Sequence, residues 1–347
     1  MSEALAGALS EALTGLTLAD LLLAVMWFGL TLYALFGGAD FGGGLWDLVA
    51  GGDVRGMPQR RLIEHSIGPV WEANHVWLIF VVVLCWTGFP DVFAAVASTL
   101  YIPLTLAAFG IIARGSAFAF RKVSAALWQQ RLFGAAFALS SVLTPFFLGT
   151  VAGAVASGRV PPGLAAGDLH TSWWNPTSWL AGALAVGTAA YLAAVYLCAD
   201  ALRHGVPELS EAFRRKALGA GVAVGLLALG GIAVVRADAP GLYDGLTGQA
   251  APLVALSALG GLASLVLLVL RRFTLVRATA AIAVAAVLWG WGVAQYPVLL
   301  RPGLTVVEAA ADPAVLEASL LAIAVGAVLL VPSLTWLFVL FQRGHRA

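Results

Sequence analysis

The stretch Arg60–Phe80 reads RRLIEHSIGPVWEANHVWLIF and places ionisable and amide side chains within an apolar segment. These polar residues are Glu64, His65, Glu72, Asn74 and His75. Such groups are rare inside membrane helices because each must find a partner or water, so a function is the first hypothesis for them. The stretch therefore predicts a membrane helix that begins near residue 68 and a candidate site on that helix.

The composition predicts an all-α polytopic membrane protein with a single membrane domain over residues 1–347. Of the 347 residues, 61% are hydrophobic and 11% are charged, against about 45–50% and about 25% in soluble domains. Hydrophobic runs of about twenty residues, the length that crosses a bilayer core of about 30 Å, recur along the chain. The formal net charge of +1 gives no general basic field, so we expect membrane lipid and no nucleic acid as a partner.

We expect nine transmembrane helices, at about residues 18–37, 68–88, 91–113, 134–156, 178–200, 217–236, 252–270, 279–297 and 315–341. Of the 19 Lys and Arg residues, all but Arg159, Arg236 and Arg301 fall in alternate links between these spans or in the C-terminal tail. Positive residues accumulate on the cytoplasmic side. The N-terminus is therefore expected outside, the C-terminus in the cytoplasm, and the number of spans is odd.

The first expected span runs into LFGGADFGGGLWDL, residues 35–48, in which two aspartates lie among glycines. Glycines let membrane helices approach one another closely. Asp40 and Asp47 are seven residues apart and share one face if the helix continues through the glycines. We interpret Asp47 as an ordinary polar residue at the cytoplasmic end of the span. For Asp40, which lies among apolar residues, a functional role and a structural role are equally open.

Glu72 and His75 are spaced i, i+3, and His65 lies seven residues before Glu72, so all three can line one helical stripe. Pro69 is expected to bend the helix, and Trp71 flanks the stripe. The pattern favours a proton relay, in which a membrane carboxylate exchanges protons with its neighbours through water. Structural hydrogen bonding is the next interpretation.

Two metal-based interpretations of this stripe are less favoured. The segment Glu72–His75 has the Glu-x-x-His form of di-iron helical bundles, but such bundles need a second pair of this kind, and the chain has none. Haem ligation by His65 or His75 is conceivable. However, the three other histidines fall in links or in the tail rather than in an opposing span. We therefore expect no metal ligands on this chain.

Arg114 lies at the cytoplasmic end of the third expected span, in GIIARGSAFAFRK. Most arginines at such positions extend to the membrane interface. Arg114 would gain a further role only if its side chain reached a buried carboxylate or an anionic cofactor.

The element GADFGGG, followed by RRLIEHSIGPVWEANHVWLI, resembles subunit II of the cytochrome bd-type quinol oxidases. Arg114, Asn175-Pro176, Tyr296-Pro297 and Val331-Pro332 extend the likeness, in order, over nearly the whole chain. The resemblance implies nine helices arranged as two four-helix bundles and one peripheral helix. It also implies a multi-pass protein of the bacterial cytoplasmic membrane.

The resemblance further implies a non-haem subunit of a quinol:oxygen oxidoreductase that pairs with a homologous, haem-bearing subunit I and leaves room for a small accessory subunit. Haem b and haem d are expected on that partner, and quinol is the expected substrate of the complex. This chain would support assembly and proton delivery and bind no cofactor. The proton-transfer candidates are Glu72, Asp40 and His75. Electrostatic or interface support is expected from Arg114, Trp71, Asn74 and His65.

The chain departs from the family pattern at several positions. The family often has an acid at the position of Gly37, and Glu72 stands where the family has an aspartate. His65 and His75 also differ from the residues common in the family, so no family role transfers to them. The alternative function is a proton-coupled secondary transporter that uses Glu72 and His75. The odd number of spans and the missing clear repeat argue against it.

Overall fold

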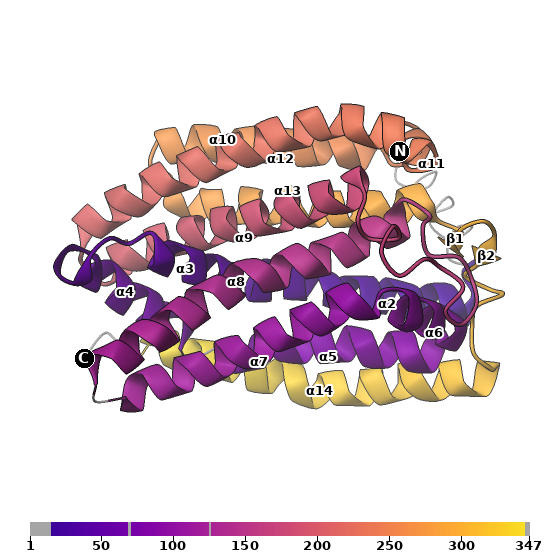
Figure 1. The fold of residues 1–347 in the computed structure, drawn as a ribbon, viewed down its shortest axis with the longest axis horizontal. Coiled ribbons are helices and arrows are strands. Elements are labelled where there is room, and N and C mark those ends of the chain that lie inside the picture. The colour runs from indigo at the N-terminus through magenta and orange to yellow at the C-terminus, as the bar shows by residue number, and fades with distance from the viewer. Residues whose placement is uncertain (1–14, 69–70, 125, 344–347) are drawn as a thin grey trace, which may run out of the picture.

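The computed structural model of the protein describes residues 15–68, 71–124 and 126–343. Within these ranges, nine helices have the length and the apolar composition needed to cross a membrane, as expected from the sequence. They run roughly along the long axis of the molecule (Figure 1). The protein is therefore an all-α polytopic membrane protein.

Nearly all of the described elements are helical. The helices are α2 (Leu18–Leu32), α3 (Gly38–Leu48), α4 (Asp53–Ile67), α5 (Trp71–Gly88), α6 (Pro90–Thr99), α7 (Tyr101–Val123), α8 (Leu127–Ala156), α9 (Pro176–Arg203), α10 (Pro207–Asp238), α11 (Pro240–Thr247), α12 (Ala251–Val269), α13 (Phe273–Gln295) and α14 (Pro313–Arg343). A π-helical turn, η1 (Tyr33–Gly37), joins α2 to α3, so that these elements form one span. Between α13 and α14, a short antiparallel hairpin pairs β1 (Val298–Leu300) with β2 (Leu304–Thr305).

Helix α9 lies at the centre of the packing. It packs against α10, α8 and α3, and its segment from Ala189 to Cys198 is largely buried. In Figure 1, α10 and α12 lie along one long side of the molecule, and α7, α5 and α14 lie along the opposite side. Helix α14 packs against α2 and α5. A division into two four-helix bundles and one peripheral helix stays a prediction.

The first span is longer than expected, because the helix continues through the glycines to Leu48. A Cβ atom at Gly42 would overlap the backbone carbonyl of Ala189 on α9. The absence of a side chain at this position therefore permits the close approach of α3 and α9. The continuous helix also places Asp40 and Asp47 two turns apart on the same face.

The third expected span has different boundaries in the structure. The range 91–113 is not one helix, since α6 ends at Thr99 and Leu100 adopts φ −105° and ψ 25° before α7 begins. The helix that is long and apolar enough to cross the membrane here is Tyr101–Arg121. The preceding α6 is a separate, short helix that begins at Pro90, a residue suited to the first turn because it has no backbone N–H to satisfy.

The stretch Arg60–Phe80 is also divided. Its first part belongs to α4, which ends at Ile67 and is not among the candidate membrane spans, and its second part begins α5 at Trp71. Pro69, expected to bend one continuous helix, lies outside the described residues. The polar residues of this stretch therefore come from two helices rather than one.

The close approach of α3 and α9 can be tested by Gly42→Ala, with Gly38→Ala as the matched control in the same helix. A Cβ at Gly38 meets no atom within 4 Å, so this control should be neutral or slightly stabilising. The added methyl at position 42 should lower the free energy of unfolding by about 1–3 kcal/mol. Thermal unfolding of both purified variants measures the difference, and equal midpoints would contradict the packing argument.

Candidate functional site

Asp40, Asn74 and Arg114 meet at one buried point although they belong to three helices. Asp40 lies in α3, Asn74 in α5 and Arg114 in α7, and their exposed fractions are 6%, 5% and 2%. Asn74 Nδ2 donates a hydrogen bond of 2.8 Å to Asp40 Oδ2. Arg114 Nη2 donates to the backbone oxygen of Asp40 at 2.9 Å. These three residues are called the Asp40 centre below.

The guanidinium of Arg114 is held by aromatic rings as well as by hydrogen bonds. Its Cζ atom lies 4.8 Å from the ring centre of Phe41 and 5.1 Å from that of Phe137, distances at which a cation is attracted to a π face. Its Nε donates to Ser141 Oγ on α8 at 3.2 Å, and the charge of Asp40 attracts it. An unpaired charge in an apolar interior is costly. These contacts explain why Arg114 is buried instead of extending to the interface.

His75 borders the Asp40 centre through aromatic contacts. Its half-buried ring lies edge-on to Phe41, with 5.7 Å between ring centres, and edge-on to Trp71 at 5.9 Å. The ring of Tyr33 lies 6.1 Å away on a third side. Edge-to-face contacts of this kind orient aromatic rings. Two predicted site residues, His75 and Trp71, are therefore packed next to the centre.

Glu72 is placed differently from the other candidates on α5. Its side chain is exposed, whereas Asn74, two residues later, is buried. Each helical residue is rotated by about 100° from the one before it, so these two side chains leave α5 on opposite sides. The same exposed face carries Val76 and Ile79. Glu72 thus lies on the surface of the described chain, away from the Asp40 centre.

His65 lies on α4 and contacts His204 at the end of α9. The two ring centres are 5.0 Å apart and the ring planes are nearly perpendicular, at 88°. The expectation of one stripe with Glu72 is wrong for His65, because α4 ends at Ile67 and α5 begins at Trp71. Among the described residues, no group of three or more His, Cys, Asp and Glu side chains is arranged to hold a metal ion.

Asp47 is buried and paired, which the sequence analysis missed. Its exposed fraction is 5%. Its Oδ1 lies 3.6 Å from Arg60 Nε on α4, and its Oδ2 accepts a hydrogen bond of 3.1 Å from Arg121 Nη1 on α7. Asp47 therefore connects α3, α4 and α7, and is not merely a polar residue at the end of a span. The seven-residue spacing between Asp40 and Asp47 could have indicated that Asp47 is buried, because it places both carboxylates on the same face of α3.

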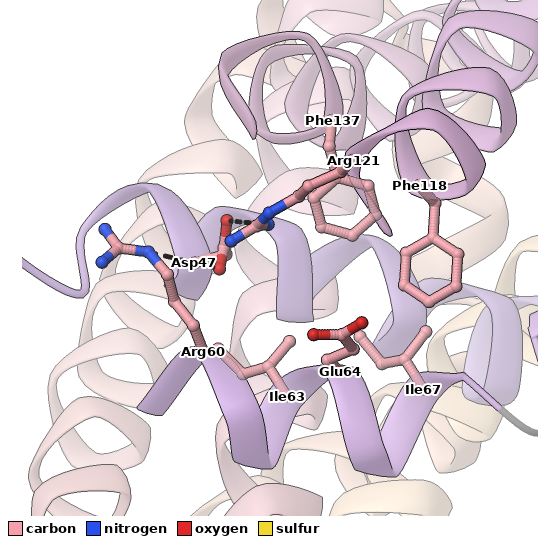
Figure 2. Close-up of a pocket in the computed structure, with 8 residues that line it drawn as sticks. All are labelled: Asp47, Arg60, Ile63, Glu64, Ile67, Phe118, Arg121 and Phe137. Carbon is pink, nitrogen blue, oxygen red and sulfur yellow. Dashed lines mark hydrogen bonds and ion pairs between the residues drawn. The ribbon is translucent and has the colours of Figure 1, made fainter. Parts of the chain in front are cut away.

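A cavity of about 10 Å³, the size that holds a single water molecule, lies beside Asp47. Figure 2 shows the carboxylate of Glu64 turned from α4 toward the space beneath Asp47 and Arg121. The ring of Phe137 lines this cavity and also packs against Arg114. The cavity therefore adjoins the Asp40 centre through this ring.

The geometry suits proton exchange and charge stabilisation better than ligand binding in an open cleft. A carboxylate, an imidazole and a phenol lie close together in largely apolar surroundings, with one buried guanidinium to balance negative charge. Ionisable groups in such environments are characteristic of functional sites. The fold and the site thus define a polytopic helical membrane protein with a buried centre that contains a carboxyl group and a guanidinium. The model of the cytochrome bd terminal oxidase subunit II family matches residues 18–341, and the chain belongs to this family.

Individual relatives agree with this assignment. The chain is 33% identical to cytochrome bd ubiquinol oxidase subunit 2 of Bacillus subtilis over 132 aligned residues. This alignment covers 38% of this chain and 37% of that protein. It is 28% identical over 175 residues to cytochrome bd-I ubiquinol oxidase subunit 2 of Escherichia coli K12, covering 48% and 44%. The matched segments thus span less than half of these relatives. The structure of bd oxidase from Geobacillus thermodenitrificans is similar over 94% of this chain and 99% of the matched chain, with a TM-score of 0.73 and 26% identity.

The charge pairing in the Asp40 centre predicts an order of stability among variants. Arg114→Met leaves the carboxylate of Asp40 without its balancing charge, and should lower the free energy of unfolding by about 3–5 kcal/mol. The double variant Asp40→Asn with Arg114→Met should recover part of this loss, because it removes both charges. Thermal unfolding of the purified protein tests the order, with Arg215→Met at an exposed position as the control. A double variant no more stable than Arg114→Met would contradict the pairing.

Proposed function

We propose that the chain is the non-haem subunit II of a bd-type terminal oxidase, and that the complex oxidises quinol and reduces oxygen to water. The family match over residues 18–341 is the observation that carries this proposal, and the similarity to a bd oxidase structure supports it. Haem b, haem d and the quinol site belong to a homologous subunit I. A small accessory subunit can complete the complex.

An exposed stripe on α5 supports an interface with subunit I. Glu72, Val76, Ile79, Val83 and Trp86 are all exposed and recur every three or four residues, so they lie on one side of the helix. A carboxylate facing lipid is unfavourable unless water or a polar group reaches it. A partner that covers this stripe would remove Glu72 from lipid and bring it close to the chemistry of the other subunit.

In this proposal Glu72 carries the proton toward subunit I, and Asp40 and His75 are the further exchange groups. Asn74, Arg114 and Trp71 hold these groups in position and balance their charge. The hydrogen bond from Asn74 to Asp40 and the edge-on contact of His75 with Trp71 support this division of roles. His65, packed on His204 at the end of α9, would support assembly rather than proton transfer.

The orientation in the membrane follows from the basic residues of the alternate links. We place the C-terminus and the Asp47 ion pairs on the cytoplasmic side, and the N-terminus outside. Protons would then enter from the cytoplasm at the end of the molecule that carries Arg60 and Arg121. The alternative of a proton-coupled transporter is not favoured, since the family and structural matches are to oxidase subunits.

The assembly proposal predicts that a tagged form of this chain, purified from native membranes in mild detergent, brings a haem protein with it. The optical difference spectrum of the purified sample should contain bands of both b-type and d-type haem. A stable monomer without haem, recovered at the full yield of the chain, would contradict the proposal.

The proton-delivery proposal predicts that Glu72→Gln slows oxygen reduction by about tenfold or more, because the amide cannot donate and accept a proton as a carboxylate does. Haem content and assembly should be unchanged. Glu72→Asp, which keeps the carboxylate, should retain more turnover than Glu72→Gln. Glu317→Gln, at an exposed position near the start of α14, is the matched control. Unchanged turnover in Glu72→Gln would remove Glu72 from the proton route.

A further inference from the structure

Two polar atoms next to the Asp40 centre are buried without a hydrogen-bond partner among the residues that the structure describes. They are Tyr33 Oη and His75 Nδ1. Tyr33 is 6% exposed, so its hydroxyl cannot be satisfied by bulk water. Buried polar atoms in proteins nearly always have a partner, which is either a protein group or an internal water molecule. The two atoms therefore indicate a bound polar ligand.

These two atoms belong to neighbouring rings. The ring centres of Tyr33 and His75 are 6.1 Å apart, and the ring planes are inclined at 47°. Phe41 packs against both residues, since it joins Tyr33 in one buried cluster and lies edge-on to His75. The two unsatisfied atoms can thus share one partner or a short chain of partners.

The backbone at Tyr33 is arranged to accommodate its ring. Tyr33 begins the π-helical turn η1, which ends at Gly37. A Cβ atom at Gly37 would lie 2.8 Å from two carbon atoms of the Tyr33 ring, so any side chain there would displace it. Isolated π-helical turns inside α-helices are frequent at functional sites. The glycine and the π-helical turn together keep the Tyr33 ring beside His75.

The chemistry of the surrounding groups selects the ligand. The opposite charges of Arg114 and Asp40 attract each other, and both act on Tyr33. A further ion would be left without a counter-charge, whereas water can donate to an imidazole nitrogen and exchange hydrogen bonds with a phenol. Water is therefore the ligand that fits a phenol and an imidazole beside two opposite charges.

We propose that one or two internal water molecules bind between Tyr33 Oη and His75 Nδ1 and pass protons between His75 and the Asp40 centre. The transport part of this inference rests on the proposed role of the chain in proton delivery. In each transfer, one proton enters the hydrogen-bonded chain at one end, every intervening O–H bond passes its proton to the next acceptor, and a different proton leaves at the other end. No group is oxidised or reduced. Tyr33 acts as a positioning residue for the water.

The bound water can be tested without any assay of turnover. A structure of the intact oxidase complex, at a resolution that resolves water, should contain density within hydrogen-bond distance of both Tyr33 Oη and His75 Nδ1. Tyr33→Phe should remove this density, whereas the control Tyr101→Phe, at an exposed position on α7, should not. No density in the unaltered protein, or density that persists in Tyr33→Phe, would overturn the proposal.

Stability provides a second test of the same site. If the phenol of Tyr33 had no partner, its removal would leave the protein as stable or more stable, because an unsatisfied buried hydroxyl is unfavourable. A hydroxyl that binds water should instead make Tyr33→Phe less heat-stable than the unaltered complex. An equal or higher unfolding midpoint for Tyr33→Phe would overturn the bound water.

The proton transfer itself is tested by turnover across a range of pH. Tyr33→Phe and His75→Leu should each slow oxygen reduction on the order of fivefold, the effect of about one hydrogen bond, and shift the pH profile while haem content stays constant. His75→Gln, which keeps a hydrogen-bonding side chain, should retain more turnover than His75→Leu. Unchanged turnover and pH profile in Tyr33→Phe and His75→Leu would overturn the transfer.

The results for Glu72 separate the two proposals. If Glu72→Gln slows turnover but Tyr33→Phe and His75→Leu do not, the proposed function stands and the water link is wrong. If Tyr33→Phe and His75→Leu slow turnover and Glu72→Gln does not, the water link stands and Glu72 is not the proton carrier.

Discussion

The interior of this protein depends on the burial of one positive charge. Arg114 is 2% exposed, and an isolated charge in an apolar interior would destabilise the fold. The structure meets this constraint with contacts from two other helices: the backbone and charge of Asp40 and the ring of Phe41 on α3, and the hydroxyl of Ser141 and the ring of Phe137 on α8. Asn74 then satisfies the carboxylate from α5. Arg114 therefore links α7 to α3 and α8, and Asp40 links α5 to the same centre.

This linkage is possible only because α3 lies very close to its neighbours. A Cβ atom at Gly44 would overlap Ser141, whose hydroxyl accepts the hydrogen bond from Arg114. A Cβ at Gly42 would likewise overlap the backbone of α9. The glycines that read as packing residues in the sequence are thus also what allows the charged centre to form. Small residues on one face of α3 therefore allow both the close packing of the helices and the formation of the charged centre.

The sequence was informative where a feature belongs to a single segment. Apolar runs predicted the number of spans, and the polar residues within them singled out Asp40, Asn74 and Arg114 as candidates, which the structure places together. Partners on different helices could not be predicted, because spacing along the chain defines the face of one helix but not its distance from another. The pairing of Asp47 with Arg60 was missed for this reason. Tyr33 was missed because the sequence alone does not distinguish a tyrosine with a functional role from an aromatic residue that only packs in the core.

The pairing of Arg114 with Asp40 also has a consequence for how the chain enters the bilayer during synthesis. The two residues are 74 positions apart, so the helix with the aspartate is made before the helix with the arginine. Each helix alone carries a charge that opposes membrane insertion by roughly 2.5–3.5 kcal/mol. The earlier helix therefore gains stability in lipid when the later one arrives, and translation imposes the order in which these segments become stable.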